Sequence, residues 1–383
     1  MRFVHTADWH LGRIFFGVHL TEDQAHVLEQ VFDLVKSSGA AALVVAGDVF
    51  DRSVPPPDAV NLLDDVLSRL ALDVGVPVIL IAGNHDSPQR LQFGSRLLRS
   101  RQLHIFGGLT REIGVVTLED NAGPVDFHAL PYAEPPVVRE CFEDGEVIDH
   151  HTAMRRCVRS CEAISPNGRR RVLIAHAFVQ GGSGCESERP LTVGGAGTVD
   201  TNCFDGFDYV ALGHLHDPQE FADGRIRYSG SLLRYSFSEG QRKVAKVVEM
   251  DASGRCTVEA VTLVPRRQFR AISGTFEEIL RGPQDGQSRD DYLEVTLLDR
   301  GALLDTMTRI RQAYPNALHL VRPFLNSAAD GESVRIDHVK MTDAELFSDF
   351  YRQVTGEPIG QPQAAAFANV IDAMRQRERE AAA

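Results

Sequence analysis

Metal-binding side chains follow five apolar segments of this 383-residue sequence. Each group comes directly after a short apolar run of the kind that forms a buried strand. The groups are Asp8 with His10, Asp48, Asn84-His85-Asp86, His176, and His214 with His216. Carboxylate, imidazole and amide groups without a thiolate suit divalent ions such as Mn²⁺ or Fe²⁺, and they argue against a cysteine-rich structural zinc site.

These groups offer at least seven candidate metal ligands, which is too many for one ion. They suit two ions that share a carboxylate and lie roughly 3.5–4 Å apart, as in two-metal hydrolases. Two such ions lower the pKa of a water between them and hold the oxygens of a phosphoryl group during its transfer. The set therefore predicts hydrolysis of a phosphate ester.

The elements that must position these groups alternate between strands and helices. The strands predicted before them are 3–6, 42–46, 77–81, 172–175 and 209–212, and helices are predicted over 21–38, with a capping box at 21–24, and over 90–101. This alternation predicts an α/β fold, a layered sandwich. Because the carboxyl ends of strands share one edge of such a sheet, even Asp8 and His216 can meet there. Gly47, Gly83 and Gly213 allow tight turns before three of the groups.

Each group taken alone has an ordinary structural explanation. Asp and His at strand ends commonly cap turns, Gly83-Asn84 is typical of a turn, and a lone His176 is more often a buried histidine than a ligand. Five groups in one chain, each at a predicted strand end, favour the metal site.

The charge of the chain limits its partners. It has 53 Asp plus Glu against 40 Lys plus Arg, a formal net charge of −13, which argues against a protein that coats nucleic acid with a basic surface. Any DNA contact is then expected at the metal edge or at the arginine clusters 96/99/101, 155/156/159 and 169/170/171. The six cysteines form no CxxC pair, and the sequence has neither an apolar run long enough to span a bilayer nor a signal-peptide pattern. We therefore expect a cytoplasmic protein without membrane contact.

The alternation of strands and helices changes near Arg266. Residues 1–265 are predicted to form the catalytic domain, residues 266–330 a small α/β domain, and residues 331–383 a linker and two amphipathic helices. Capping boxes are predicted at 275–278 and 342–345. The two C-terminal helices lack a core of their own, so they are expected to dock on a partner helix or coil, or to fold back on the small domain.

The five groups resemble the motifs of the calcineurin-like metallophosphoesterases. The matching segments are Asp8-Trp9-His10, Gly47-Asp48-Val49-Phe50-Asp51-Arg52, Gly83-Asn84-His85-Asp86, His176 and Gly213-His214-Leu215-His216. The segments 5–12, Ser187-Glu188-Arg189-Pro190-Leu191 and Tyr228-Ser229-Gly230-Ser231 are similar to the bacterial SbcD-type nucleases. This narrower resemblance extends over essentially the whole chain.

The resemblance implies a role for each residue of the site. One ion would be held by Asp8, His10, Asp48 and His216, and the second by Asp48, Asn84, His176 and His214, with Asp48 shared. His85 would bind no metal and would stand beside the scissile phosphate, where it stabilises charge and helps to protonate the leaving oxygen. Asp51 and Asp86 would either orient these groups or cap their own loops, and both interpretations stay open.

The resemblance also implies a function and partners. It implies a metallophosphoesterase with two divalent ions, Mn²⁺ being expected, that acts as a DNA exonuclease and endonuclease. An SbcC-type coiled-coil ATPase would bind the C-terminal helices, and the complex of the two proteins would process double-strand breaks and hairpins. Residues 266–330 would form a capping domain. A homodimer would form through the helices near 62–70 and 91–98, whose leucines equally suit a core.

Two other functions remain in competition. The first is a phosphatase or small phosphodiester hydrolase on the same fold. It is disfavoured because related protein phosphatases typically carry Glu where this chain has Asp86. The second is a non-catalytic subunit that only adapts the ATPase to DNA, and the complete ligand set argues against it.

Overall fold

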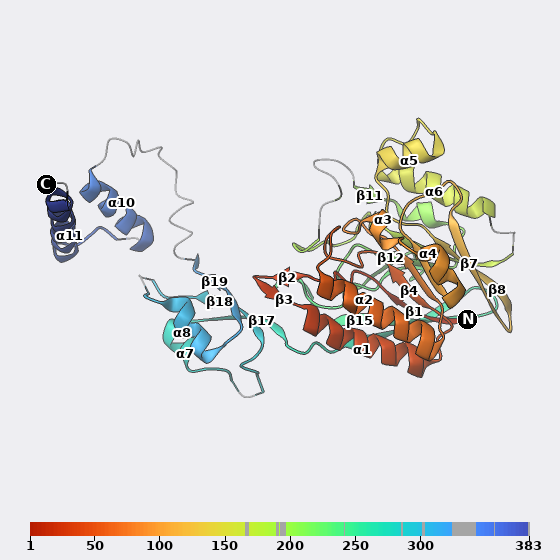
Figure 1. Cartoon of the computed structure of the whole chain (residues 1–383), viewed down its shortest axis with the longest axis horizontal. Coiled ribbons are helices and arrows are strands. Elements are labelled where there is room, and N and C mark those ends of the chain that lie inside the picture. The colour runs from red at the N-terminus through yellow and green to blue at the C-terminus, as the bar shows by residue number, and fades with distance from the viewer. Residues whose placement is uncertain are drawn as a thin grey trace. The chain divides into compact units, whose positions relative to one another are not determined.

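The computed structural model describes residues 1–164, 168–188, 191, 197–240, 242–284, 286–300, 303–323, 342–355 and 357–381. The chain divides into two compact units, Met1–Arg266 and Arg267–Ala383, and Figure 1 labels many of their elements. The linker predicted at the start of 331–383 lies outside the described residues.

Two six-stranded sheets form the first unit (Figure 1). The first has the order β16 (Cys256–Leu263), β15 (Lys243–Met250), β1 (Arg2–Thr6), β4 (Leu43–Ala46), β5 (Val78–Ile81), β6 (Leu103–Phe106). The second has the order β13 (Gln219–Phe221), β14 (Ile226–Tyr228), β12 (Tyr209–Gly213), β9 (Arg170–His176), β8 (Gly123–Ala129), β7 (Gly114–Asp120). Strands β1, β4 and β5 run parallel in the first sheet, and β9 and β12 do so in the second. The predicted α/β sandwich is confirmed.

The two sheets face each other across an apolar core. Phe3 and Val44 of the first sheet and Phe127 and Tyr209 of the second have no exposed surface, and the Phe3 and Phe127 rings lie 5.3 Å apart, edge to face. A second core fills the other face of the second sheet, under α5 (Pro135–Phe142) and α6 (His150–Ile164). Burial on both faces explains why the strands are continuous apolar runs in the sequence.

The first helix begins differently from the prediction. Helix α1 (Thr21–Ser38) ends at Gly39 in the left-handed conformation, but Leu20 occupies its N-cap and no side chain caps it, so the predicted capping box is wrong. Gln24 is buried, and its amide donates to the carbonyl oxygens of Trp9 (3.2 Å) and His10 (2.7 Å). Its side chain is therefore used to hold the loop that carries His10.

The helix predicted over 90–101 is broken. The structure has α3 (Pro88–Leu91), α4 (Ser95–Leu98) and a 3-10 turn at Arg99–Arg101. Gly94 stands at the break with a φ of 73°, a conformation that an α-helix does not contain. Before this region, α2 (Pro57–Arg69) begins at a proline. The short pairs β2 (Ile14–Phe15) with β3 (Val18–His19), and β10 (Phe178–Val179) with β11 (Thr198–Val199), complete the first unit.

The second unit contains a three-stranded parallel sheet of β17 (Phe269–Gly274), β18 (Tyr292–Leu297) and β19 (Ala317–Val321), with α7 (Phe276–Leu280) and α8 (Thr306–Ala313). The capping box predicted at Thr275 is present. Two further helices, α10 (Asp343–Thr355) and α11 (Gln361–Ala381), pack through Phe347 and Phe367, whose parallel rings lie 3.9 Å apart. In the described part of the chain no helix has the length and apolar content needed to cross a membrane.

Candidate metal centre

The ends of five strands bring the predicted ligands to one place. Asp8 and His10 follow β1, Asp48 follows β4, Asn84 follows β5, His176 ends β9, and His214 and His216 follow β12. The loops come so close that only glycine fits between them. A Cβ on Gly83 would lie 2.1 Å from Asp48 Oδ1, and one on Gly213 would lie 2.0 Å from the carbonyl oxygen of Ala46.

Asp48 lies at the centre of the site. Its Oδ2 is 3.6 Å from His10 Nε2 and 3.5 Å from His176 Nε2, while its Oδ1 accepts the backbone N–H of His85 at 2.8 Å. The same carboxylate therefore faces one imidazole from each of the two predicted ligand groups. Asp48 is 2% exposed.

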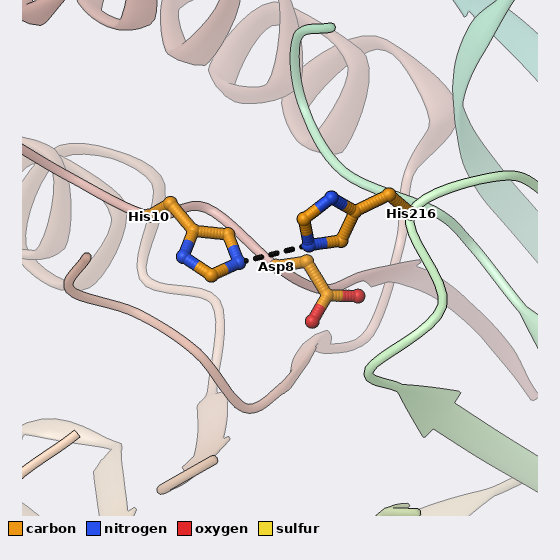
Figure 2. A group of neighbouring side chains, drawn as sticks. All are labelled: Asp8, His10 and His216. Carbon is orange, nitrogen blue, oxygen red and sulfur yellow. Dashed lines mark hydrogen bonds between the residues drawn. The ribbon is translucent and has the colours of Figure 1, made fainter. Parts of the chain in front are cut away.

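His10 and His216 face each other beside Asp8 (Figure 2). Their Nε2 atoms lie 3.1 Å apart, and His216 Nδ1 lies 3.2 Å from the Glu239 carboxylate. Because a carboxylate only accepts, His216 carries its hydrogen on Nδ1 and turns the lone pair of Nε2 toward His10. The Asp8 carboxylate accepts the backbone N–H of His214 at 2.9 Å. Two imidazole nitrogens and a carboxylate directed at one point fit a divalent cation.

Asn84, His176 and His214 form the other half of the site. The Asn84 Oδ1 lies 2.9 Å from His176 Nε2 and 3.2 Å from His214 Nδ1. His176 Nδ1 donates to the carbonyl oxygen of Ala46 at 3.0 Å, so the neutral ring presents a lone pair, not a hydrogen, to the Asn84 oxygen. Two acceptors that face each other in a buried site also fit a cation between them.

Burial sets the protonation states of this cluster. It raises the pKa of Asp8 well above its ordinary value, with repulsion from Asp48 adding to the effect. It lowers the pKa of His10 to about 4. Burial is also the largest cause of the lowered pKa of the other three imidazoles, those of His176, His214 and His216. A neutral imidazole is the state of histidine that binds a metal ion.

Backbone strain is concentrated at the same residues. Positive φ angles occur at Asp8 (52°), His10 (46°), Asp48 (48°) and His214 (110°). For a residue with a Cβ, such angles cost on the order of 1–3 kcal/mol each and persist where the surrounding structure enforces them. Four strained residues that follow strands of two facing sheets and meet in one cluster indicate a functional site.

His85 stands next to this cluster. Its Nδ1 donates to the carbonyl oxygen of Asp51 at 2.8 Å, its ring is half-buried, and its ring centroid lies 4.7 Å from that of His10. His10, Asp51 and His85 also come close enough to form a further possible ligand group. The Asp51 carboxylate accepts from Arg13 at 2.8 Å.

Asp86 caps the loops that carry the ligands. It accepts the backbone N–H groups of Val49 (3.0 Å), Phe50 (2.9 Å) and Gly83 (2.9 Å). Val49 and Phe50 follow Asp48, and Gly83 precedes Asn84. By capping these loops Asp86 also orients the ligands on them, so both interpretations of Asp86 describe the same hydrogen bonds.

Sequence reasoning missed the groups that surround His216. Ser187, Glu188 and Glu239 all contact His216. The segment Ser187-Glu188 stands out in the sequence only through its resemblance, and Glu239 has no motif around it. The one signal for Glu239 is Lys243, four residues further on, with which it forms an ion pair at 2.6 Å.

The arginine clusters differ in their exposure and in the ion pairs that they already form, and so in how readily they could bind DNA phosphates. Arg169 pairs with Asp126 at 2.9 Å, and Arg170, which is 6% exposed, pairs with Asp120 at 2.5 Å. This cluster is the least suited of the three to bind phosphates. Arg96 is exposed.

Comparison with known proteins places the chain in a family. The calcineurin-like phosphoesterase model matches residues 1–218, and the model for the type 5 capsule protein repressor C-terminal domain matches residues 265–355. The D subunit of the nuclease SbcCD from Staphylococcus saprophyticus is 35% identical over 377 residues, which are 98% of this chain and 98% of that protein. The chain belongs to the SbcD family of calcineurin-like phosphoesterases.

As a member of this family, the chain is a hydrolase of the metallophosphoesterase and nuclease class. The family also implies divalent metal ions, which agrees with the donor set described above. Two solved structures are similar at low identity. A dimetal phosphatase from Danio rerio has 12% identity and a TM-score of 0.41 and covers 69% of this chain and 97% of its own. The calcineurin-like phosphoesterase YfkN from Bacillus subtilis has 15% identity and a TM-score of 0.39 and covers 69% and 90%.

Proposed function

We propose that this chain is a metal-dependent DNA exonuclease and endonuclease that acts with an SbcC-type ATPase on double-strand breaks and hairpins. The relative of 35% identity is named as the D subunit of the nuclease SbcCD, and the match covers 98% of both chains. The observation that carries the proposal is the position of Asp48, whose Oδ2 lies 3.6 Å from His10 and 3.5 Å from His176. A carboxylate between two ligand groups suits a bridge between two divalent ions.

The proposed ligands divide into two sets. Asp8, His10, Asp48 and His216 would hold one ion, and Asp48, Asn84, His176 and His214 would hold the other. Mn²⁺ suits this mixture of oxygen and imidazole ligands. When bound, the ions supply positive charge to the phosphate oxygens and lower the pKa of an attacking water.

His85 is the proposed catalytic residue. The Asp51 carbonyl oxygen accepts its Nδ1–H, so the ring is fixed and Nε2 is left for the substrate. From this position a protonated His85 stabilises charge on the scissile phosphate and donates a proton to the leaving oxygen. The Asp51 carbonyl then stabilises the imidazolium through the hydrogen bond that it already accepts.

Two surfaces support the proposed partners. Phe93 (86% exposed) and Leu97 (80% exposed) are large apolar side chains of the α3–α4 region that face solvent, and burying them would favour a homodimer. In the C-terminal helices, Phe350 (59% exposed), Val370 (57%) and Met374 (52%) are available to a coiled-coil ATPase. Residues 266–330 would be the capping domain, and a cytoplasmic location follows from the proposed role in DNA repair.

The first experiment tests the reaction. Purified full-length protein would be incubated with Mn²⁺ and linear duplex DNA, with and without the ATPase, beside the variants His85→Gln and His19→Gln. We expect DNA degradation that requires metal, is lost in His85→Gln and is kept in His19→Gln, whose histidine is exposed on β3. His85→Gln should still bind Mn²⁺ in calorimetry. Efficient phosphomonoester hydrolysis without DNA cleavage would contradict the proposal.

The second experiment tests the partner. Deletion of 342–383 should abolish co-purification with the ATPase, while Mn²⁺ binding stays at the wild-type level. A truncated protein that still binds the ATPase would refute the assignment of this surface.

A further inference from the structure

His216 is held from the side that faces away from the candidate metal centre. Its Nδ1 lies 2.7 Å from Ser187 Oγ and 3.2 Å from Glu239 Oε1, while its Nε2 faces His10 at 3.1 Å. Ser187 comes from the segment after β10, and Glu239 comes from the segment before β15. Two distant parts of the first unit thus meet on one ring.

The position of each hydrogen follows from the groups present. The Glu239 carboxylate only accepts, and the single hydroxyl hydrogen of Ser187 is donated to Glu239 Oε1. Ser187 Oγ is then left with lone pairs alone, so the hydrogen between it and His216 comes from Nδ1. A neutral imidazole with its hydrogen on Nδ1 has its lone pair on Nε2, which is the form a metal ligand requires.

Glu239 is itself firmly placed. It is 3% exposed, accepts the backbone N–H of Tyr235 at 3.0 Å and forms an ion pair with Lys243 at 2.6 Å. Lys243 also donates to the carbonyl oxygen of His216 at 2.8 Å. On the other side, Glu188 accepts the backbone N–H of His216 at 2.7 Å. The ring and both main-chain polar groups of His216 are therefore fixed.

We infer that Glu239 and Ser187 are positioning residues that set the tautomer and direction of His216 for metal binding. The inference rests on the proposed metal site and deepens it, because it makes the segment that carries Ser187 and Glu188 part of that site. Cys185, His216 and Glu239 also lie close enough together to suggest a further metal position. However, Lys243 neutralises the charge of Glu239, and His216 Nδ1 carries a hydrogen and has no lone pair for a metal ion. These groups therefore form a chain of hydrogen bonds and not a metal site.

The first test measures the tautomer in metal-free, full-length protein. Histidine labelled with ¹⁵N reports which ring nitrogen carries the hydrogen, and a His216→Asn variant assigns the resonance. Wild-type protein should show His216 with its hydrogen on Nδ1. Glu239→Gln should shift the ring toward the other tautomer, because the glutamine amide can donate to Nδ1. A ring that keeps its hydrogen on Nδ1 in both Glu239→Gln and Ser187→Ala would overturn the inference.

The second test measures Mn²⁺ affinity by calorimetry, without any substrate. Loss of a carboxylate that orients a ligating histidine typically weakens metal binding about 10–100-fold, and we expect such a loss in Glu239→Gln and a smaller one in Ser187→Ala. Glu186→Gln is the matched control, since it removes one charge from an exposed residue of the same segment. It should bind Mn²⁺ as the wild type does. Wild-type affinity in both test variants would overturn the inference.

Misfolding of a variant and failure of the proposed function can each be told apart from failure of the inference. If Glu239→Gln does not fold, Ser187→Ala decides, because it removes only a half-buried hydroxyl. If the wild type binds no Mn²⁺, the proposed function fails, and the tautomer in metal-free protein still decides whether Glu239 and Ser187 set the form of His216.

Discussion

Asp86 offers a sharp test of how the loops of the site are held together. Its carboxylate is 7% exposed and accepts three backbone N–H groups, those of Val49, Phe50 and Gly83. Asp86→Ala leaves all three without an acceptor. Asp86→Asn keeps one acceptor oxygen and turns an NH₂ toward at least one of the donors.

The expected magnitude follows from these contacts. A buried donor left without a partner costs about 1–3 kcal/mol. The free energy of unfolding should therefore fall by about 1–3 kcal/mol in Asp86→Asn, where one donor loses its acceptor, and by about 3–9 kcal/mol in Asp86→Ala, where three do. For a unit of this size each kcal/mol corresponds to about 2 °C in Tm.

The assay is thermal and urea unfolding of the metal-free protein at pH 8. This pH is needed because burial, together with the charge of Asp48, raises the pKa of Asp86 to about 7. Asp33→Asn is the control, since it makes the same change on the exposed face of α1 and should shift stability by less than about 0.5 kcal/mol. If Asp86→Ala is within about 1 kcal/mol of the wild type, the three hydrogen bonds do not hold these loops.

Three other predictions concern the same unit. Mn²⁺ at a hundred times its Kd should stabilise the protein by about 2.7 kcal/mol, seen in calorimetry as a rise in Tm that a chelator reverses; an unchanged Tm would count against the site. Burial lowers the pKa of His5 to about 3, so as the pH falls the His5 imidazole is protonated in the unfolded chain before it is protonated in the folded protein. Through this residue the free energy of unfolding falls by about 1.4 kcal/mol per pH unit as the pH drops from about 6.5 toward 3. His5→Asn should reduce that slope in urea titrations, and an identical slope would show that His5 is protonated in the folded state. Gly83→Ala would place a Cβ 2.1 Å from Asp48 Oδ1, so Mn²⁺ affinity should fall at least tenfold in calorimetry, whereas Gly145→Ala, where a Cβ meets nothing within 4 Å, should leave it unchanged.

Local patterns predicted some elements well and others badly. The capping box at Thr275 is present because its Glu278 is free to reach back to the helix start. The similar pattern at Thr21 fails, because Gln24 is buried and bonds the loop of His10 instead. The helix expected over 90–101 breaks at Gly94. In the last two cases a tertiary contact or a backbone conformation outweighs a preference of modest energy.

The sequence by itself determined the kinds of ligand and their positions at strand ends. Apolar runs identify buried strands, and the α/β alternation predicted one shared sheet edge at which residues as distant as Asp8 and His216 would meet. In the structure Asp8 follows a strand of the first sheet and His216 follows a strand of the second, so the residues meet where the two sheets face each other. Only the tertiary structure decided what holds those ligands. Ser187 and Glu239 on His216, and Asp86 on two loops, are hydrogen bonds between segments that no local pattern connects. Such partners depend on where each loop turns after its strand, and that path is fixed only when both sheets are packed.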